Sequence, residues 1–156
     1  MTWDELVVFP KWDQALQLVV RIAIAAILGG SIGFEREIKG KAAGIRTHML
    51  VCMGTAIIIL TARLDGIPIA DMSRVIDGVV SGIGFLGGGV ILKLSQEREI
   101  KGITTAAGIW ATAAIGIAIG LGQVWIAIVS ALVVLMILSV LGYTDKKLWG
   151  MDKDEA

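Results

Sequence analysis

Few residues of this 156-residue chain could do chemistry, and they do not cluster. The only histidine is His48 and the only cysteine is Cys52, so a Ser-His-Asp centre, a Cys-His centre or a metal site built on cysteines has too few members. Carboxylates are the other candidates, since Mg²⁺ prefers hard oxygen ligands. However, the two that come closest to the apolar segments, Glu35 and Asp77, lie at opposite ends of theirs. We therefore expect no catalytic residues, no bound metal and no cofactor.

A set of charged and hydroxyl residues flanks the apolar segments instead. The string EREIKG, which begins at Glu35, recurs at positions 97–102. Charges of alternating sign favour pairing between the two copies, although exposed ion pairs are weak unless they form a network. Thr104 and Thr105 follow the second copy, where we expect their hydroxyls to cap a helix. We predict one polar cap that carries the function, made of Glu35, Arg36, Lys41, Arg46, Thr47, Thr104 and Thr105.

Two opposite charges, Arg21 and Asp77, lie inside apolar segments rather than beside them. A charge within a bilayer is costly unless it is paired or reaches the interface. The long stem of Arg21 would let it snorkel outward, which is the alternative to pairing. Because both residues are expected at similar depth, we predict that they form an ion pair between the first and third helices.

Glycines occur at the spacing that lets membrane helices pack closely. Pairs four residues apart are Gly29/Gly33, Gly78/Gly82, Gly84/Gly88 and Gly116/Gly120. The segment 78–89 is the richest in glycine, and we interpret it either as a packing face or as a weakened helix that lines a path. Its candidate residues are Gly78, Ser81, Gly82, Gly84, Gly87 and Gly88. We add Trp110, which does not fit an aromatic belt at the membrane surface. The small-residue faces also favour a homodimer.

Composition indicates that membrane helices must position these residues. The chain is 56% hydrophobic and has 20 glycines besides, which is more apolar surface than a soluble domain of this length can bury. The net charge is zero, which argues against a nucleic-acid partner. Five charge-poor segments are suited to cross a lipid bilayer: 14–34, 47–64, 75–92, 104–120 and 124–142. The expected fold is an all-α integral membrane protein of about five transmembrane helices.

Basic residues indicate the orientation of these helices. Lys and Arg concentrate in the loops after the first and third segments and after the fifth, and loops of this kind face the cytoplasm. The N-terminus is therefore expected outside and the C-terminus inside. This divides the chain into an outer segment at 1–13, a transmembrane domain at 14–142 and a short cytoplasmic tail at 143–156. Because the repeated string follows the first and third helices, we interpret helices 1–2 and 3–4 as a parallel repeat, to which a fifth helix is added.

Four motifs together resemble the membrane domain of the MgtC/SapB family. They are GFERE at 33–37, KAAGIRTH at 41–48, SGIGFLGGGVI at 81–91, and KGITTAA at 101–107 with Trp110. The resemblance covers about residues 15–142 and implies a bacterial cytoplasmic (inner) membrane protein of about five spans. It also implies a link to low-Mg²⁺ adaptation and, in pathogens, to survival inside macrophages, with the ATP synthase as one proposed partner. Longer members carry a soluble C-terminal domain, which we expect this short form to lack.

Two functions of different classes fit these observations. The favoured one is a non-enzymatic regulatory membrane protein of MgtC/SapB type, linked to low-Mg²⁺ adaptation and virulence, that contacts other membrane proteins through its glycine-rich faces. The alternative is a small ion or solute transporter or channel, in which the third helix lines the path. Transport of Mg²⁺ calls for a set of oxygen ligands near the middle of the membrane, whereas the sequence places glycines there. For this reason we prefer the regulator.

Overall fold

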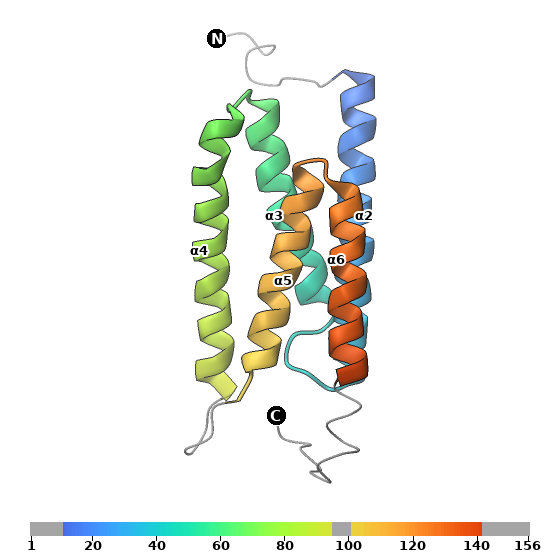
Figure 1. Cartoon of the computed structure of the whole chain (residues 1–156), viewed down its shortest axis with the longest axis vertical. Coiled ribbons are helices and arrows are strands. Elements are labelled where there is room, and N and C mark those ends of the chain that lie inside the picture. Colours follow the sequence, from blue (N-terminus) through green and yellow to red (C-terminus); the bar gives the residue numbers. More distant parts are fainter. Residues whose placement is uncertain (1–10, 95–100, 142–156) are drawn as a thin grey trace.

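Five upright α-helices make up the computed structural model, which describes residues 11–94 and 101–141 (Figure 1). The helices are α2 (Trp12–Ile38), α3 (Ile45–Leu64), α4 (Ile69–Leu94), α5 (Ile103–Gly120) and α6 (Val124–Met136), and α6 continues into a π-helical turn, η1 (Ile137–Leu141). They run alternately up and down. The α3–α4 and α5–α6 turns therefore lie at the upper end of the bundle in Figure 1, and the α2–α3 loop lies at the lower end.

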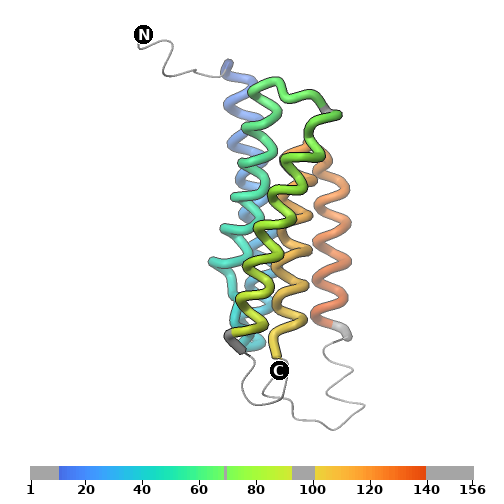
Figure 2. The backbone as a smooth tube through the Cα atoms, turned by 90° about the vertical axis from the view of Figure 1, so that its left-hand side faces the viewer, coloured from blue at the N-terminus to red at the C-terminus, as the bar shows by residue number. Residues whose placement is uncertain are grey.

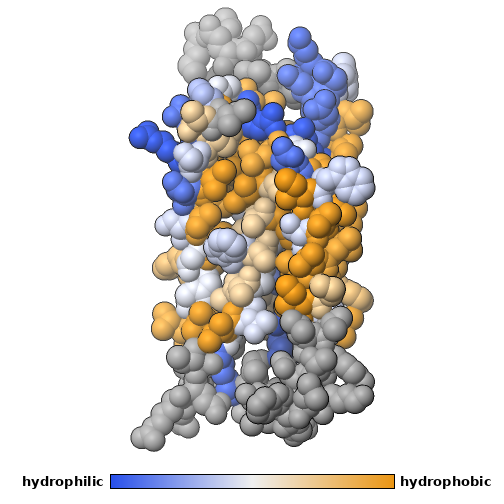
Figure 3. Space-filling view, viewed as in Figure 1, coloured by the Kyte–Doolittle hydropathy of each residue, from blue (hydrophilic) through white to orange (hydrophobic). Residues whose placement is uncertain are grey.

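Four of these helices, α2 to α5, are long and apolar enough to cross a membrane. At a rise of about 1.5 Å per residue, even the 18 residues of α5 extend about 27 Å, close to the thickness of the hydrocarbon core. The fifth helix, α6, has 13 residues and gains length from η1. Apolar side chains cover the middle of the bundle, and hydrophilic ones gather towards its upper end (Figure 3). The expected all-α membrane fold is thus confirmed.

The bundle is organised around α3 and α5, which pack against each other. The first helix, α2, packs along α3, whereas α4 packs chiefly on α5, and α6 turns back onto α5 and also meets α2. As a result, α3 and α4 touch little, although a short turn joins them directly. Helix α4 stands at the edge of the bundle, and Figure 2, which looks onto it, shows no described helix in front of it.

Glycines allow α3 to lie very close to its two main neighbours. A Cβ on Gly33 of α2 would be 2.6 Å from the Ile45 Cα, and a Cβ on Gly120 of α5 would be 2.6 Å from the Ile59 Cβ. Both distances are shorter than real Cβ contacts, so neither position tolerates a side chain unless the helices move apart. Two of the glycine pairs identified in the sequence are therefore packed inside the chain: Gly29/Gly33 and Gly116/Gly120.

Two helices are longer than the sequence predicts. Helix α2 continues beyond 34 to Ile38, which brings Glu35 and Arg36 into the helix rather than into a loop. Helix α4 begins at Ile69 instead of 75. Pro68 precedes it, and its carbonyl oxygen accepts hydrogen bonds from two amides of the first turn. Charges mark where an apolar segment ends, but a helix ends only where its backbone geometry changes.

The tight hairpin predicted between the last two helices is confirmed. Gly122 has a positive φ of 85°, which glycine adopts without strain, and the Gln123 amide donates to the Ala118 carbonyl oxygen at 2.8 Å. The second EREIKG string falls mostly within residues 95–100, outside the described part of the chain. The pairing of the two strings and the parallel repeat therefore stay predictions, as do the segments expected before residue 11 and after 141.

Candidate functional site

A small ion-pair network lies at the lower end of α2. The Glu35 side chain is 11% exposed; its Oε1 is 2.6 Å from Lys39 Nζ and its Oε2 is 3.7 Å from Arg36 Nη1. Lys39 Nζ also donates to the carbonyl oxygen of Leu138 at 2.6 Å. That carbonyl lies in η1, near the end of the last helix, where carbonyl groups lack helical partners and attract cations. Lys39 therefore ties the end of α2 to the end of α6.

His48 is fully buried in the first turn of α3 and hydrogen-bonds across to α5. Thr112 Oγ1 donates to the Gly108 carbonyl oxygen at 2.8 Å. It is also 2.8 Å from His48 Nδ1, so this hydroxyl links the His48 ring to the Gly108 carbonyl, and the direction of the Nδ1 hydrogen bond follows the His48 tautomer. His48 Nε2 and Arg36 Nε are buried without a hydrogen-bond partner among the described residues. The lower half of the bundle thus contains a buried polar cluster of Glu35, Arg36, His48 and Thr112.

Thr112 was not identified in the sequence, although a signal for it exists. It lies four residues after Gly108 and four before Gly116, so it belongs to the small-residue face with which α5 meets α3. A hydroxyl at such a position is well placed to hydrogen-bond across the interface. The spacing of glycines alone identifies only the small residues of this face, and so its polar member was missed.

Glu37 has a role that spacing alone did not reveal. Its Oε2 accepts a hydrogen bond from the Ile45 amide at 2.9 Å and so caps the start of α3, where a negative charge is favourable. The residue at the N-cap itself, Gly44, has no side chain to do this. Because the carboxylate reaches across the α2–α3 loop, only the shape of that loop identifies the cap.

The other members of the predicted polar cap lie at the same end of the bundle: Lys41, Arg46, Thr47, Thr104 and Thr105. Arg46 and Thr47 are exposed on the first turn of α3, and Thr105 is buried on the first turn of α5. The expected capping of α5 by Thr104 or Thr105 is wrong. Gly102, in a left-handed conformation with φ of 87°, is the N-cap, and no side chain caps that helix end. Helix α5 begins at Ile103, directly after this glycine, which leaves the threonines inside the helix.

Helix α4 turns most of its glycines away from the other described helices. Among the described residues, a Cβ on Gly78, Gly82, Gly84 or Gly88 would meet no atom within 4 Å, whereas one on Gly87 would lie 3.5 Å from the Ala106 Cβ of α5. A bulky side chain projects from the same side, since Phe85 is 84% exposed. We call the exposed residues of this side the α4 face: Arg74, Asp77, Gly78, Ser81, Gly82, Gly84, Phe85 and Gly88.

Two charges of the α4 face, Arg74 and Asp77, make no ion pair or hydrogen bond within the described part of the chain. Asp77 follows the start of α4 by about 12 Å of helix axis, well inside the apolar stretch. The ion pair predicted between Asp77 and Arg21 does not form. Arg21 Nη1 instead donates to the Gly120 carbonyl oxygen at 3.5 Å, because α2 faces the α5–α6 turn and not α4.

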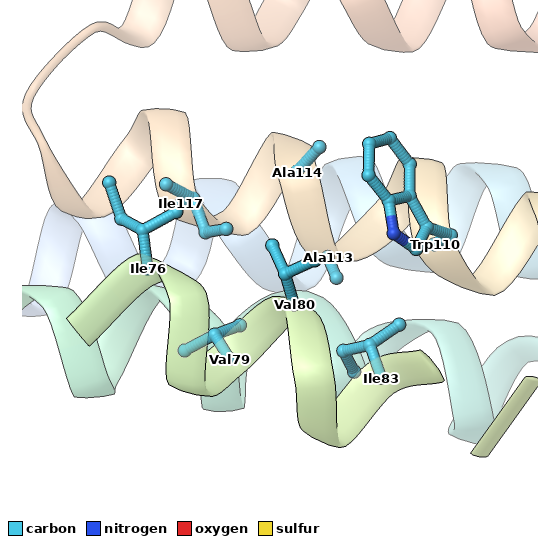
Figure 4. A pocket seen from close by; sticks show the side chains of 8 residues that line it. All are labelled: Ile76, Val79, Val80, Ile83, Trp110, Ala113, Ala114 and Ile117. Atoms are coloured by element: carbon cyan, nitrogen blue, oxygen red, sulfur yellow. The ribbon is translucent and has the colours of Figure 1, made fainter. Parts of the chain in front are cut away.

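Apolar hollows flank α4 on both sides. A groove of about 590 Å³ lies between α3 and α4; Gly54, Gly78 and Gly82 form part of its wall, and Arg74 also lines it. On the other side, Trp110 and aliphatic side chains of α4 and α5 line a pocket of about 250 Å³ (Figure 4). No group of three or more metal-binding side chains occurs among residues 11–94 and 101–141. The aliphatic side chains that line both hollows suit them to apolar contacts.

The fold and these surfaces define a class: a multi-pass α-helical membrane protein with a buried polar cluster at one end and an open glycine-rich helix at its edge. Comparison with known families refines the class. The model of the MgtC family matches residues 22–147, so the chain belongs to the MgtC family.

Several relatives support this assignment. The chain is 42% identical over 132 residues to "Putative magnesium transporter YhiD" of Escherichia coli (strain K12), a match that covers 80% of this chain and 60% of YhiD. It is 37% identical over 144 residues to Protein SrpB of Synechococcus elongatus, covering 85% and 79% of the two chains. The match to Protein MgtC of Brucella abortus is 39% over 116 residues, covering 72% and 46%. The chain thus spans about half to three-fifths of YhiD and MgtC, and no solved structure matches it.

Proposed function

We propose that this chain is a non-enzymatic regulatory membrane protein of MgtC/SapB type, linked to low-Mg²⁺ adaptation, which acts through helix–helix contacts made by the α4 face. Its expected location is the bacterial cytoplasmic membrane. The lower end, where basic residues concentrate, would face the cytoplasm and the N-terminus would lie outside. The buried polar cluster would then hold the cytoplasmic ends of α2, α3 and α5 in place while α4 engages a partner.

The observation that carries this proposal is Asp77 on an open glycine face. Exposed apolar side chains alone do not call for a protein partner, because lipid covers them equally well. An aspartate within a membrane helix is different, since it costs about 2.5–3.5 kcal/mol on insertion scales when it lies at the helix centre. A partner that supplies a cation to Asp77 removes part of that cost. The open glycines beside it let the partner's backbone approach closely.

The charges of the α4 face favour a second copy of this chain as the partner. In a dimer with its twofold axis along the membrane normal, the two α4 helices are parallel and equivalent residues share one depth. Arg74 of one copy then lies about one turn from the partner's Asp77, and the reciprocal pair forms as well. Phe85 projects from the same face beside Gly84 and Gly88, so each copy offers both a knob and a space to receive one. Charge and shape are therefore self-complementary.

Complementation of growth at low Mg²⁺ tests the functional part of the proposal. A bacterial strain that lacks its own MgtC family protein would express either the wild-type chain or one of two variants. Gly82→Leu changes the α4 face, and Ala23→Leu, at an exposed position of α2, is the matched control. Gly82→Leu introduces a side chain into open space, so it should reach the membrane in normal amounts and yet fail to restore growth. Ala23→Leu should restore it. Growth restored by Gly82→Leu at the wild-type level would refute a role for the α4 face.

A flux assay separates the regulator from the transporter. The full chain is reconstituted into liposomes that contain a Mg²⁺-sensitive dye, and the uptake rate is measured against external Mg²⁺ concentration. The regulator predicts no saturable uptake above that of protein-free liposomes. Saturable uptake that Glu35→Gln or Asp77→Asn abolishes would establish the transporter instead.

A further inference from the structure

We propose that the upper end of the bundle binds a single phosphate group between Arg21 of α2 and Arg63 of α3. Both side chains reach the turn between α5 and α6. Arg21 Nη1 donates to the Gly120 carbonyl oxygen at 3.5 Å, and Arg63 Nη1 makes a short hydrogen bond to the Leu121 carbonyl oxygen. Two guanidinium groups from different helices therefore meet over one turn.

The space beside Gly122 shows how closely the two guanidinium groups approach each other. The point where a Cβ on Gly122 would stand lies 3.2 Å from Arg21 Nη2 and 3.4 Å from Arg63 Nη1. The two nitrogens thus border the same small volume and can donate to two oxygens of one tetrahedral anion. A guanidinium group has five N–H donors. Within the described residues, the guanidinium groups of Arg21 and Arg63 hydrogen-bond only to the α5–α6 turn, so each has further donors for an anion.

Within residues 11–94 and 101–141, no acidic side chain pairs with the two arginines at this turn. The C-terminal end of α5 supplies only about half a negative charge. Two cations that close together repel each other, so an anion between them would relieve the repulsion. The first turn of α6 adds to the positive potential, because it begins directly after the turn and has no side-chain cap.

Depth indicates where the phosphate comes from. Arg21 is about 14 Å of helix axis below Trp12, at which α2 begins, so the α5–α6 turn lies below the upper ends of α2, α3 and α4 (Figure 1). The long arginine stems can run along apolar surface while the guanidinium groups stay at the level of the lipid headgroups. The ligand chemistry is therefore a phosphate ester or phosphate ion, supplied by an anionic lipid of the adjacent leaflet or by free phosphate.

Lipid retention by the purified full chain tests the site. Protein in neutral detergent is mixed with equal amounts of phosphatidylglycerol and phosphatidylcholine, and native mass spectrometry counts the lipids that remain bound. The wild-type chain should retain phosphatidylglycerol preferentially. Arg21→Gln and Arg63→Gln should each lower that preference about tenfold, the effect of one lost charge-assisted hydrogen bond. Lys11→Gln, which removes a positive charge from the same end but away from the turn, should leave it unchanged.

Free phosphate is tested separately by thermal unfolding in lipid-free detergent. If inorganic phosphate raises the melting temperature of the wild-type chain but not of Arg63→Gln, and phosphatidylglycerol does not, the ligand is the free ion. If the glutamine variants fail to fold, Arg63→Lys replaces them. It keeps the positive charge but loses the planar guanidinium group with its paired N–H donors, so its preference for phosphatidylglycerol should fall below that of the wild type. The site is refuted if the Arg21 and Arg63 variants retain phosphatidylglycerol as well as the wild type does. It is also refuted if Lys11→Gln loses phosphatidylglycerol as much as the arginine variants do.

Discussion

Gly116 of α5 lies directly against Thr55 of α3, so closely that a Cβ on Gly116 would overlap the Thr55 hydroxyl oxygen. That hydroxyl has one proton and three carbonyl oxygens within reach: those of Val51 and Cys52 in its own helix, at 3.0 and 3.1 Å, and that of Ala113 across the interface, at 3.2 Å. Gly82 of α4 also has a second glycine four residues away, yet a Cβ on Gly82 would meet no atom of the described helices within 4 Å. The two glycines differ in what faces them. Gly116 serves the packing of this chain, whereas Gly82 belongs to the α4 face, which we propose as the contact with a partner.

Alanine substitutions should separate these two kinds of glycine. Gly116→Ala forces α5 away from α3 and should lower the free energy of unfolding by about 1–3 kcal/mol. Gly82→Ala adds a methyl group to open space and favours the helix, so it should be neutral or stabilising by up to about 1 kcal/mol. Unfolding of the two variants in mixed detergent micelles measures the difference. Equal destabilisation by both would contradict the packing described here.

The buried hydrogen bond between His48 and Thr112 should contribute measurably to stability. Thr112→Val keeps the shape of the side chain but removes the hydroxyl that pairs with His48 Nδ1, which should cost about 1–3 kcal/mol. Thr47→Val, on an exposed position of α3, is the matched control and should change little. Thermal unfolding of the purified variants provides the measurement. If both variants melt at the same temperature as the wild type, His48 Nδ1 has another hydrogen-bond partner.

Glu37 should stabilise the start of α3 locally rather than the bundle as a whole. Glu37→Gln removes the negative charge that caps the Ile45 amide, with an expected loss of about 1 kcal/mol. Hydrogen exchange should accelerate in the first turn of α3 and stay unchanged in α5. Asp65→Asn, which alters an exposed carboxylate just after the same helix, should leave that turn protected. Uniformly faster exchange throughout α3 would show that Glu37 acts in some other way.

Lys39 should fasten η1 to the end of α2. Lys39→Met keeps an apolar stem but loses both the ion pair with Glu35 and the hydrogen bond to the Leu138 carbonyl oxygen. We expect the rate of amide hydrogen exchange within η1 to rise about tenfold, because a hydrogen bond to a charged group is lost. Mass-spectrometric exchange on the membrane-embedded protein measures this. Unchanged exchange in η1 would mean that α6 is held by its apolar contacts alone.

Much of the fold was predictable because the positions of charged residues and glycines along the chain determine where apolar segments end and where helices can pack closely. The five apolar segments, the hairpin at Gly122 and the close-packing pairs around Gly33 and Gly116 all follow from local spacing. Helix ends were less predictable, as Glu35 and Arg36 show, because a charged residue at the membrane surface does not stop a helix.

The polar contacts were largely unpredictable because they depend on which helices become neighbours. Arg21 and Asp77 have suitable signs and depths, but α2 does not face α4, so Arg21 binds the α5–α6 turn instead. Spacing identified Gly82 and Gly116 equally and could not show that only one of them has a neighbour. The functional roles of the predicted polar cap and the α4 face accordingly rest on experiment.

Disulfide cross-linking in native membranes tests whether the α4 face joins two copies of this chain. A single cysteine is placed at Ser81, the middle of the face, in a chain whose buried Cys52 is replaced by alanine. Mild oxidation should give a species of twice the chain mass, while a cysteine at Leu132, 62% exposed on α6, should give none. Adding Gly82→Leu to the Ser81→Cys chain should abolish the dimer. If Ser81→Cys stays monomeric, or cross-links no better than Leu132→Cys, the α4 face is not the interface.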